Sequence, residues 1–297
     1  MTRGRTVLFA FVCAVAVATL YAAQPVLAEV GGDLGVPDAG LGWIVTAGQL
    51  GYLVGLAFLV PLGDLTDRRR LIAVHLVLAG AGATLAAVAG RPWLLLAGLA
   101  LAGLFAVVVQ TTVAYAAALS TPEARGRTLG TVTSGVVAGI LGGRVLAGGL
   151  AAVWGWRSVY GTLAVLLLVL AYLVMRLLPP DPRTDRTTYR QVLTSLGRLF
   201  RERLFVSRGL IAFFLFASFG TLWSGLALPL GSAPWHLNTA QIGLFGIAGL
   251  AGALGAARAG RSCCSPPRGR PRVRPRGRCG WSAPGWSCST SPCRRCT

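Results

Sequence analysis

Long apolar runs separated by short polar segments dominate the hydrophobic pattern of the chain. A run of about 20 apolar residues is long enough to cross the hydrocarbon core of a bilayer as an α-helix. Packing all of these runs inside a soluble protein would need more polar covering surface than 297 residues provide. We therefore predict an all-α integral membrane protein with about eight transmembrane helices. The predicted spans are residues 7–27, 41–62, 71–88, 93–119, 129–153, 159–178, 209–230 and 242–257.

The composition argues against an ordinary soluble enzyme. Hydrophobic residues make up 54% of the chain and charged residues only 12%, against roughly 25% in soluble domains. All 28 basic residues are arginine, and with 9 acidic residues they give a formal net charge of +19. Such a balance is typical of proteins that bind membranes or nucleic acids. Because most arginines lie between the apolar runs, we expect the lipid bilayer as a partner and no nucleic acid.

The positions of the arginines predict the orientation of the chain. The predicted outer loops contain only Arg91 and Arg157, and the first of these loops is acidic. The predicted inner segments contain Arg3, Arg5, Arg68, Arg69, Arg70, Arg125, Arg127, the eight arginines from Arg176 to Arg208, and Arg258. By the positive-inside rule this asymmetry predicts a multi-pass protein of the inner (plasma) membrane with a cytoplasmic N-terminus.

A polar connector divides the spans into two groups. Residues 179–208 begin with Pro-Pro-Asp-Pro, and residues 189–204 then place apolar side chains at helical spacing among arginines, which predicts an amphipathic helix at the inner headgroup level. Residues 34–41 and 237–244 repeat a Leu and a Gly-Leu pair at the same spacing, which indicates two duplicated bundles. The predicted domains are a six-helix bundle at 1–178, the connector at 179–208, a partial second bundle of two helices at 209–260 and a tail at 261–297.

The loop after the second span carries a family resemblance. It reads Gly-Asp-Leu-Thr-Asp-Arg-Arg-Arg-Leu-Ile over residues 63–72 and resembles the signature loop of the major facilitator superfamily. The Gln24-Pro25 pair and the Gly-Gln-Leu-Gly at 48–51 are similar to the bacterial sugar and drug efflux branch of that family. The resemblance implies a major facilitator-type bundle and a secondary active transporter that exports a small molecule by alternating access.

The resemblance also implies a conformational gate in this loop. The implied gate residues are Gly63, Asp64, Asp67, Arg68, Arg69 and Arg70. A carboxylate beside arginines at the ends of two helices forms a charge network that can exist in one conformation and break in another. In the family the aspartate is taken to brace helix eleven of the other bundle. The alternative for the arginines is that they are ordinary cytoplasmic anchors.

The fifth span combines glycines with one arginine. Gly135, Gly139, Gly143 and Gly148 predict close helix packing and resemble the glycine-rich motif of drug exporters, in which Arg144 takes the place of a usual proline. An arginine inside a span is costly unless it faces a watery cavity or a partner, so Arg144 is a candidate functional residue. Generic helix packing and a purely structural charge are the alternatives for these two features.

The family plan places further polar residues around a central substrate cavity. The predicted cavity residues are Tyr21, Gln24, Gln110, Thr111, Tyr115, Arg144 and Trp223. For the glutamines an interhelical hydrogen bond is the alternative role. The span interiors contain no acidic residue, and Leu99 stands where the family has an arginine in helix four, so H⁺ is only one candidate for the coupling ion.

The tail at 261–297 differs in composition, because it is rich in Arg, Pro, Ser and Cys and contains no acid. A zinc site at Cys293 and Cys296 lacks a matching second pair, and no catalytic set converges elsewhere, so we expect no metal, no cofactor and no enzyme activity. A shifted reading frame explains the composition better than a basic lipid- or nucleic-acid-binding arm. On that interpretation helices nine to twelve are missing, which leaves two expectations open for the chain as given: an exporter or an inactive remnant. The alternative is a membrane-anchored regulatory or scaffold protein that uses the basic tail.

Overall fold

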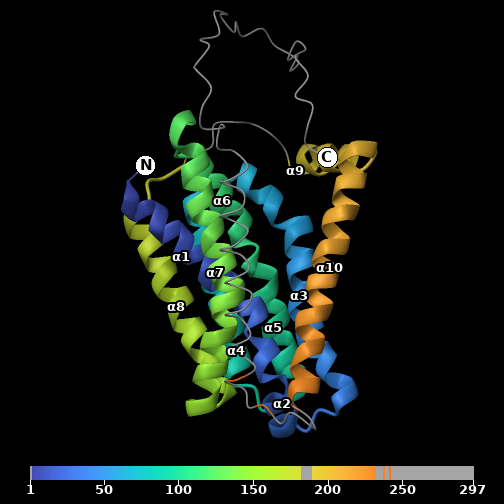
Figure 1. Cartoon of the computed structure of the whole chain (residues 1–297). Helices are drawn as coiled ribbons and strands as arrows, with labels where there is room; N and C mark the ends of the chain where they lie inside the picture. The colour runs from blue at the N-terminus through green and yellow to red at the C-terminus, as the bar shows by residue number, and fades with distance from the viewer. Residues whose placement is uncertain (1, 182–188, 232–236, 238–240, 242–297) are drawn as a thin grey trace, which may run out of the picture. The chain divides into compact units, whose positions relative to one another are not determined.

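A computed structural model describes residues 2–181, 189–231, 237 and 241 of the chain. Within these residues the chain forms ten α-helices and one short 3₁₀ helix, η1 (Figure 1). The elements are α1 (Arg3–Tyr21), α2 (Ala23–Leu34), α3 (Asp38–Phe58), η1 (Val60–Asp64), α4 (Arg68–Ala87), α5 (Pro92–Ala106), α6 (Val108–Ala118), α7 (Pro122–Trp154), α8 (Trp156–Leu177), α9 (Tyr189–Leu199) and α10 (Arg203–Gly231).

Seven helical stretches of the described part are long and apolar enough to cross a membrane. They agree in number and order with the first seven predicted spans, which confirms the all-helical membrane fold. The predicted first span ends too early, because its helix continues as α2 to Leu34. The predicted eighth span, at 242–257, lies outside the described residues.

The first span consists of two helices, with a break at Ala22 between α1 and α2. Pro25 explains the break, since proline has no N–H to bond the carbonyl of Tyr21 four residues earlier and its ring crowds that carbonyl. The chain therefore continues as a new helix instead of ending at Leu27. The break lies next to Gln24, one of the predicted cavity residues.

The fourth span is also divided, at Val107 between α5 and α6. The amide of Gln110 donates to the carbonyl of Val107 at 2.9 Å, three residues back, so the chain tightens locally at this point. Neither proline nor glycine stands at the break, and the hydrophobic pattern runs through it without change.

Glycines on α7 allow α1 to pack directly against its backbone. A Cβ added at Gly135 would lie 2.8 Å from the Cα of Ala10, one at Gly139 would lie 2.7 Å from the Cα of Ala14, and one at Gly143 would lie 2.9 Å from a methyl group. The three glycines are four residues apart and form one face of the helix. Any larger side chain on this face would push the two helices apart.

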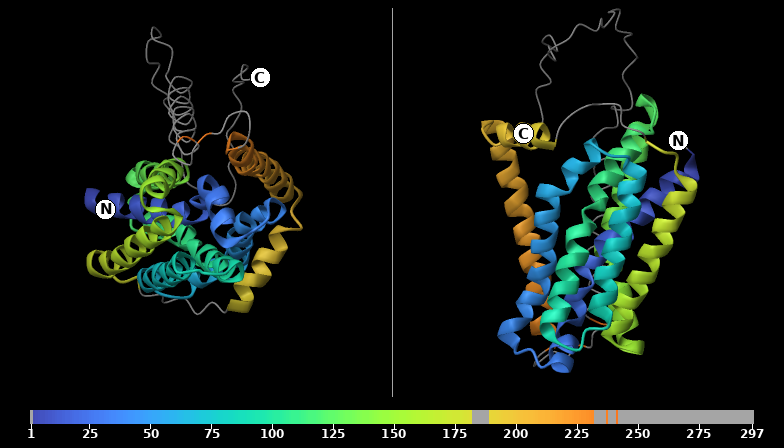
Figure 2. Two further views of the ribbon diagram at one scale, coloured as in Figure 1. Left: turned by 90° about the horizontal axis from the view of Figure 1, so that it is seen from below. Right: turned by 180° about the vertical axis from the view of Figure 1, so that it is seen from behind.

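Similar contacts join α3, α4 and α5. An added Cβ at Gly51 would lie 2.9 Å from the carbonyl carbon of Ala100, and one at Gly103 would lie 2.9 Å from that of Gly48. An added Cβ at Gly82 would lie 2.5 Å from the backbone nitrogen of Ala102. Figure 2 shows these helices end-on and from behind. Backbone proximity through small residues is thus the general packing mode of the first six spans.

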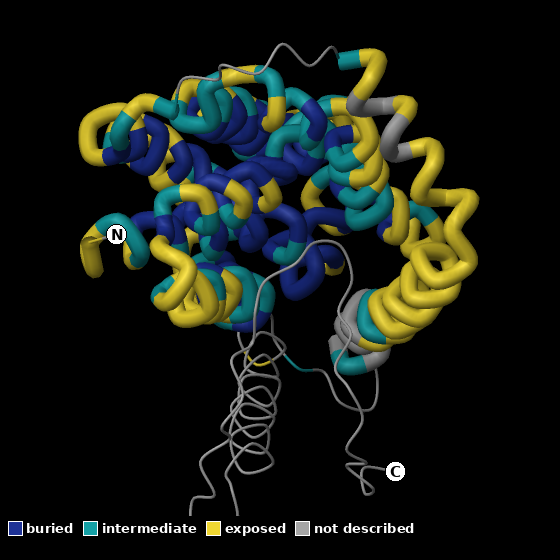
Figure 3. The backbone as a smooth tube through the Cα atoms, turned by 90° about the horizontal axis from the view of Figure 1, so that it is seen from above, coloured by how far each residue is buried: buried dark blue, intermediate teal, exposed yellow. Residues whose placement is uncertain are grey.

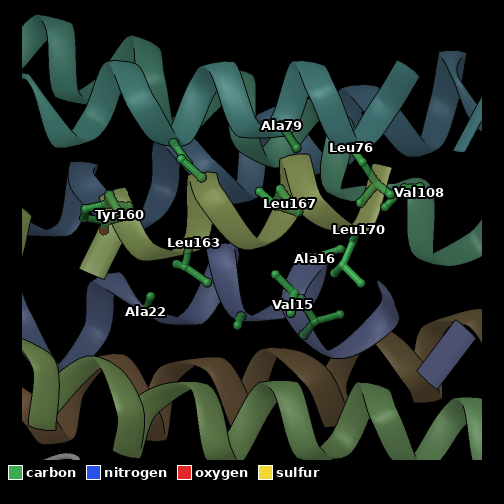
Figure 4. Close-up of a cluster of buried hydrophobic side chains, with 14 of the residues drawn as sticks. Val15, Ala16, Ala22, Leu76, Ala79, Val108, Tyr160, Leu163, Leu167 and Leu170 are labelled. Atoms are coloured by element: carbon green, nitrogen blue, oxygen red, sulfur yellow. The ribbon is translucent and has the colours of Figure 1, made fainter. Parts of the chain in front are cut away.

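Buried side chains gather where the first six spans face each other, as the tube coloured by burial shows (Figure 3). In the close-up of Figure 4, Tyr160, Leu163 and Leu167 of α8 lie between the ribbons of α4 and α1. All three side chains are at least nine-tenths buried. Because lipid is as apolar as leucine, this packing gains van der Waals contact more than hydrophobic burial.

The connector and seventh span follow the first six spans. Helix α9 (Tyr189–Leu199) lies within the predicted amphipathic stretch, but the helix ends at Leu199, and Leu204 belongs to α10. The prediction of one amphipathic helix that reaches Leu204 is therefore wrong, because the helix ends five residues earlier. Helix α10 contacts α2, and its side chains from Arg203 to Ser218 are exposed on all sides (Figure 3).

Candidate functional site

Arginines at the starts of α1 and α4 donate hydrogen bonds to backbone carbonyls at the end of α8. Arg5 at the start of α1 donates to the carbonyl of Leu177 at 3.3 Å, and Arg69 at the start of α4 donates to the carbonyl of Met175. Both carbonyls belong to the last turn of α8. We call this end of the bundle, at the top of Figure 1, the arginine-rich end. Cations there also complement the negative end of the α8 dipole.

Asp67 of the predicted gate caps α4 and also holds the connector. Its Oδ1 accepts a hydrogen bond from the amide of Arg69 at 2.9 Å, which satisfies one of the open N–H groups at the start of the helix. The same oxygen accepts the amide of Asp181 at 3.3 Å. Asp67 therefore fixes the start of the connector against the loop between the second and third spans.

Arg68 forms ion pairs with one carboxylate of the loop, Asp64, and one of the connector, Asp181. Its Nη2 lies 3.3 Å from Asp64, its Nη1 lies 3.8 Å from Asp181, and its Nε donates to the carbonyl of Gly63 at 3.1 Å. The Arg68 side chain is only 11% exposed, so these contacts are partly shielded from water. Arg70, by contrast, is 80% exposed and lies 4.0 Å from Asp67.

Asp181 is a member of the network that the sequence analysis did not identify. It follows the Pro-Pro pair at the start of the connector, where composition indicates only a helix breaker. The family resemblance assigns the partner of Asp67 to helix eleven, whereas in the structure the connector supplies a partner within the described residues. Gly63 itself is not sterically required, since an added Cβ would meet Thr111 at an ordinary 3.5 Å.

A second polar cluster surrounds Arg144 in the middle part of α7. Arg144 is 3% exposed, and Gln24 is equally buried. The Nε of Arg144 donates to the Oε1 of Gln24 at 2.8 Å, and its Nη1 donates to the carbonyl of Ile140 at 2.9 Å. Its Cζ lies 4.9 Å from the centre of the Tyr21 ring, in the range of a cation–π contact. We call Arg144, Gln24 and Tyr21 the arginine cluster.

The arginine cluster lies where three spans meet. Arg144 comes from the fifth span, and Tyr21 and Gln24 come from either side of the break in the first span. The ring of Phe219 on α10, the seventh span, has its centre 5.6 Å from the Cζ of Arg144. A residue of the seventh span therefore contacts the buried arginine of the first bundle.

The structure does not gather all predicted cavity residues at this cluster. Gln110 donates to the hydroxyl of Tyr52 at 3.3 Å, on an exposed face. Thr111 lies beside Gly63, and the hydroxyl of Tyr115 donates to the carbonyl of Pro179 at the connector. The side chain of Trp223 lies outside the described residues.

Tyr115 lies near the arginine-rich end of the bundle, far along the helix axis from the arginine cluster. Its ring packs edge-on against Phe9 of α1 with the ring centres 5.5 Å apart. Phe9 and Tyr21 are twelve residues apart on one helix, which corresponds to about 18 Å along its axis. Thr111 and Tyr115 thus belong with the predicted gate and not with the arginine cluster.

The opposite end of the bundle is held by acids of α2. The Oε1 of Glu29 accepts the amide of Trp156 at 2.9 Å, and Asp33 accepts from the indole of Trp156 at 3.2 Å and from Arg157 at 2.5 Å. The hydrogen bond from Arg157, and then that from Trp156, lowers the pKa of Asp33. Gly155, with φ of 76°, permits the sharp turn from α7 into α8 that presents these donors.

An apolar groove of about 470 Å³ runs between α1, α7 and α8. Gly135, Gly139 and Gly143 line it together with aliphatic side chains such as Leu146, but Arg144 and Gln24 do not. Among the described residues, no group of three His, Cys, Asp or Glu could hold a metal ion. The candidate zinc ligands Cys293 and Cys296 lie outside that part of the chain.

Comparison with known proteins gives one family and several relatives. The family model described as Major Facilitator Superfamily matches residues 7–274. The uncharacterised transporter YgaY of Escherichia coli K12 is 41% identical over 239 residues, which cover 80% of this chain and 61% of that protein. A chloramphenicol resistance protein of Streptomyces lividans is 31% identical over 253 residues, which cover 75% of this chain and 62% of that protein. The chain thus spans about three fifths of the length of these relatives.

The crystal structure of a D-xylose-proton symporter is similar in fold. It superimposes with a TM-score of 0.61 at 14% sequence identity, and the match covers 86% of this chain and 68% of the symporter chain. At this identity the similarity concerns the arrangement of helices and not the cargo.

Proposed function

The chain belongs to the Major Facilitator Superfamily, and from this premise we propose that it exports a small molecule by alternating access, with the arginine cluster at the central binding site. Transporters of this architecture bind their cargo near the bilayer midplane between two bundles that rock against each other. A buried arginine inside a span is a functional candidate by default, because its charge is costly in an apolar environment. Members of the family are transporters and not enzymes.

The contact of Arg144 with both Gln24 and Phe219 carries this proposal. Gln24 belongs to the first bundle, and Phe219 belongs to the first helix after the connector. A group that contacts both sides can respond when one side moves relative to the other. The divided first span beside Gln24 supports the same conclusion, because broken helices are tolerated where they line a site.

We propose that the network of Asp67, Arg68 and Asp181 is the gate at the arginine-rich end. The partly buried guanidinium of Arg68 pairs through one nitrogen with Asp181 at 3.8 Å and through another with Asp64 at 3.3 Å. Breaking such contacts costs free energy that contacts in a second conformation must offset, and this gives a two-state switch. The connector would then move with the gate, since Asp181 is its third residue.

The arginine asymmetry supports a cytoplasmic position of the arginine-rich end and an inner-membrane location. Export is supported by the name of the S. lividans relative, because resistance to a drug is gained when the drug is removed from the cell. None of the nine acidic residues lies within the eight spans predicted from the sequence, so coupling to H⁺ would have to use a group other than a carboxylate inside those spans. The complete cycle needs a second bundle, to which the described residues contribute one span.

An accumulation assay tests the proposal. Cells lacking their own efflux pumps would express the chain, and the uptake of radiolabelled chloramphenicol and benzoate would be measured with and without an ionophore that collapses the proton gradient. We expect energised cells to accumulate less of at least one probe than cells with Arg144→Gln. Arg91→Gln, which removes an arginine at an exposed helix start, is the matched control and should behave like the parent.

Equal accumulation of both probes in all strains would contradict export. Arg144→Gln is interpreted only at equal membrane abundance and equal thermal stability in detergent. Arg144→Lys keeps the charge and checks whether charge or shape is required.

A further inference from the structure

The apolar groove between α1, α7 and α8 follows most of the length of these three spans (Figure 1). On α7 its lining extends from Thr131 to Leu150, which is about 28 Å of helix, close to the roughly 30 Å of a hydrocarbon core. Its volume of about 470 Å³ is within the range of about 300–1,000 Å³ that is usual for ligand sites. Phe11 and Leu146 in its lining are more than half exposed, so a ligand can enter it from the bilayer.

The lining of the groove favours an apolar occupant. Its side chains are aliphatic or aromatic except for three hydroxyl groups, those of Thr131, Ser134 and Thr162. The hydroxyl of Thr131 already donates to the carbonyl of Arg127 at 3.1 Å, and that of Ser134 donates to the carbonyl of Thr131 at 2.7 Å. A flexible hydrocarbon chain needs no hydrogen bonds, and it gains van der Waals contact along the whole groove.

Two of the helices that line the groove carry an arginine one turn before the lining begins. The first lining residue is Val7 on α1 and Thr131 on α7, and Arg3 and Arg127 precede them by four residues on the same helix faces. Both arginines are exposed. Long side chains on a helix point back toward its start, so we expect both guanidinium groups just beyond the end of the groove, at the level of the lipid headgroups.

The two arginines lie at nearly the same height in the bundle. Gly135 packs on Ala10 and Gly139 packs on Ala14, so α1 and α7 run parallel, and their first turns lie together at the arginine-rich end. The described helices α1, α7 and α8 contain a single acid, Glu123. This end of the groove therefore has a net positive charge.

The other end of the groove differs in charge. Its lining ends near Leu150 of α7 and Val159 of α8, close to the turn between these helices. The arginine of that turn, Arg157, forms an ion pair with Asp33. The groove is thus apolar along its length and has arginines without a printed carboxylate partner only beside the arginine-rich end, which matches a ligand with one anionic end and a long apolar body.

We propose that the groove binds an acyl chain of an anionic phospholipid, whose headgroup contacts Arg3 and Arg127. Guanidinium groups bind phosphate oxygens through paired hydrogen bonds. Each arginine near the membrane surface strengthens the binding of an anionic lipid by about 5-fold, so two of them give roughly 30-fold. This site goes beyond the proposed function, because neither Arg144 nor Gln24 lines the groove.

Lipid binding to the purified 297-residue chain in detergent tests the proposal. Native mass spectrometry would follow titrations with phosphatidylglycerol and with phosphatidylcholine that carries the same acyl chains. We expect one phosphatidylglycerol to bind roughly 30-fold more tightly than phosphatidylcholine. Glycerol 3-phosphate, which has the anionic group without the chains, should not displace it at the same concentration.

Variants separate the groove from the general positive charge of the arginine-rich end. Arg3→Gln and Arg127→Gln should each lower the preference for phosphatidylglycerol by about 5-fold. Arg125→Gln is the matched control, since Arg125 is equally exposed but lies two residues from Arg127 and hence on another face of α7. It should keep the full preference.

A second pair of variants tests the position of the acyl chain. Ala138 is exposed and lines the groove, so Ala138→Phe should fill it and lose the bound lipid. Ala152, exposed on the same helix, is not part of the lining, and Ala152→Phe should bind like the parent.

The proposal is overturned by equal affinity for the two lipids, or by an equal loss in Arg125→Gln and Arg127→Gln. Unchanged lipid binding in Ala138→Phe, or displacement by glycerol 3-phosphate, would place the lipid outside the groove. A dimer in place of the bound lipid would show a second copy as the occupant. Arg127→Lys keeps the charge and should bind phosphatidylglycerol nearly as the parent does, which guards against a variant that fails to fold. None of these results depends on export in the accumulation assay.

Discussion

Replacing Gly139 with alanine should destabilise the chain because the α1–α7 interface has no space for a methyl group. An added Cβ would lie 2.7 Å from the Cα of Ala14, 2.8 Å from its carbonyl carbon and closer still to its oxygen. Ordinary contacts of a Cβ begin at about 3.4 Å. All three obstructing atoms belong to the backbone, so no side chain can rotate away and the helices must separate by about 1 Å.

The expected cost follows from this displacement. A gap of 0.5–1 Å loses about a quarter to a half of the dispersion energy of each contact across it. Overpacking of this kind typically costs about 1–3 kcal/mol. Alanine also favours the helix over glycine by about 1 kcal/mol, which would partly hide the effect if Gly139→Ala were measured alone.

Gly142→Ala is therefore the matched control. It lies on the same helix and gains the same helix propensity, but an added Cβ at Gly142 meets nothing within 4 Å. Unfolding in mixed detergent, followed by tryptophan fluorescence, would measure both variants. We expect Gly139→Ala to be less stable than Gly142→Ala by about 1–3 kcal/mol. Equal stability of the two would refute the close packing of α1 on α7.

Three further predictions concern the two ends of the bundle. Asp67→Ala should lower the free energy of unfolding by about 1 kcal/mol, because the cap of α4 is lost. Asp67→Asn keeps a cap and should reduce export at unchanged stability. Export by Asp67→Asn at the parent level would argue against the gate. Because Arg157 lowers the pKa of Asp33, their contact should stabilise the fold above the unfolded pKa of about 3.9 and lose this effect as the pH falls through the lower folded value. The stability difference between the parent and Asp33→Asn should thus be present at pH 7 and shrink in acid, and a difference that grows in acid would contradict this assignment. Reporter fusions should place Asp33 outside and Arg125 inside, and the reverse result would overturn the orientation.

The sequence predicted the spans well because their signal is the one that the bilayer imposes. Every backbone group in lipid must bond within its own helix, so apolar length alone identifies the first seven spans. The close packing at Gly135, Gly139 and Gly143 was also visible, since a spacing of four places small residues on one face. The ends of the spans were less certain, as the continuation of the first span to Leu34 shows.

The candidate site was only partly visible in the sequence. Arg144 stands out because a charge inside an apolar run needs an explanation, and Gln24 was named with it. The family plan assigns Thr111 and Tyr115 to the same cavity, but their contacts with Gly63 and Pro179 place them at the arginine-rich end. Asp181 was missed because its role depends on a tertiary contact with Asp67, and nothing in the local sequence encodes that contact.

Access to Gln24 from each side of the membrane tests the central claim most directly. In a background without the seven native cysteines, Gln24→Cys would be probed in oriented vesicles with a membrane-impermeant thiol reagent. Val12→Cys, on the fully buried face of α1, should stay unreactive, and Asp33→Cys should react from the outer side only. We predict that Gln24→Cys reacts from either side and that a probe exported in the accumulation assay changes the ratio of the two rates. Protection from both sides, or reaction from one side under every condition, would contradict alternating access at the arginine cluster.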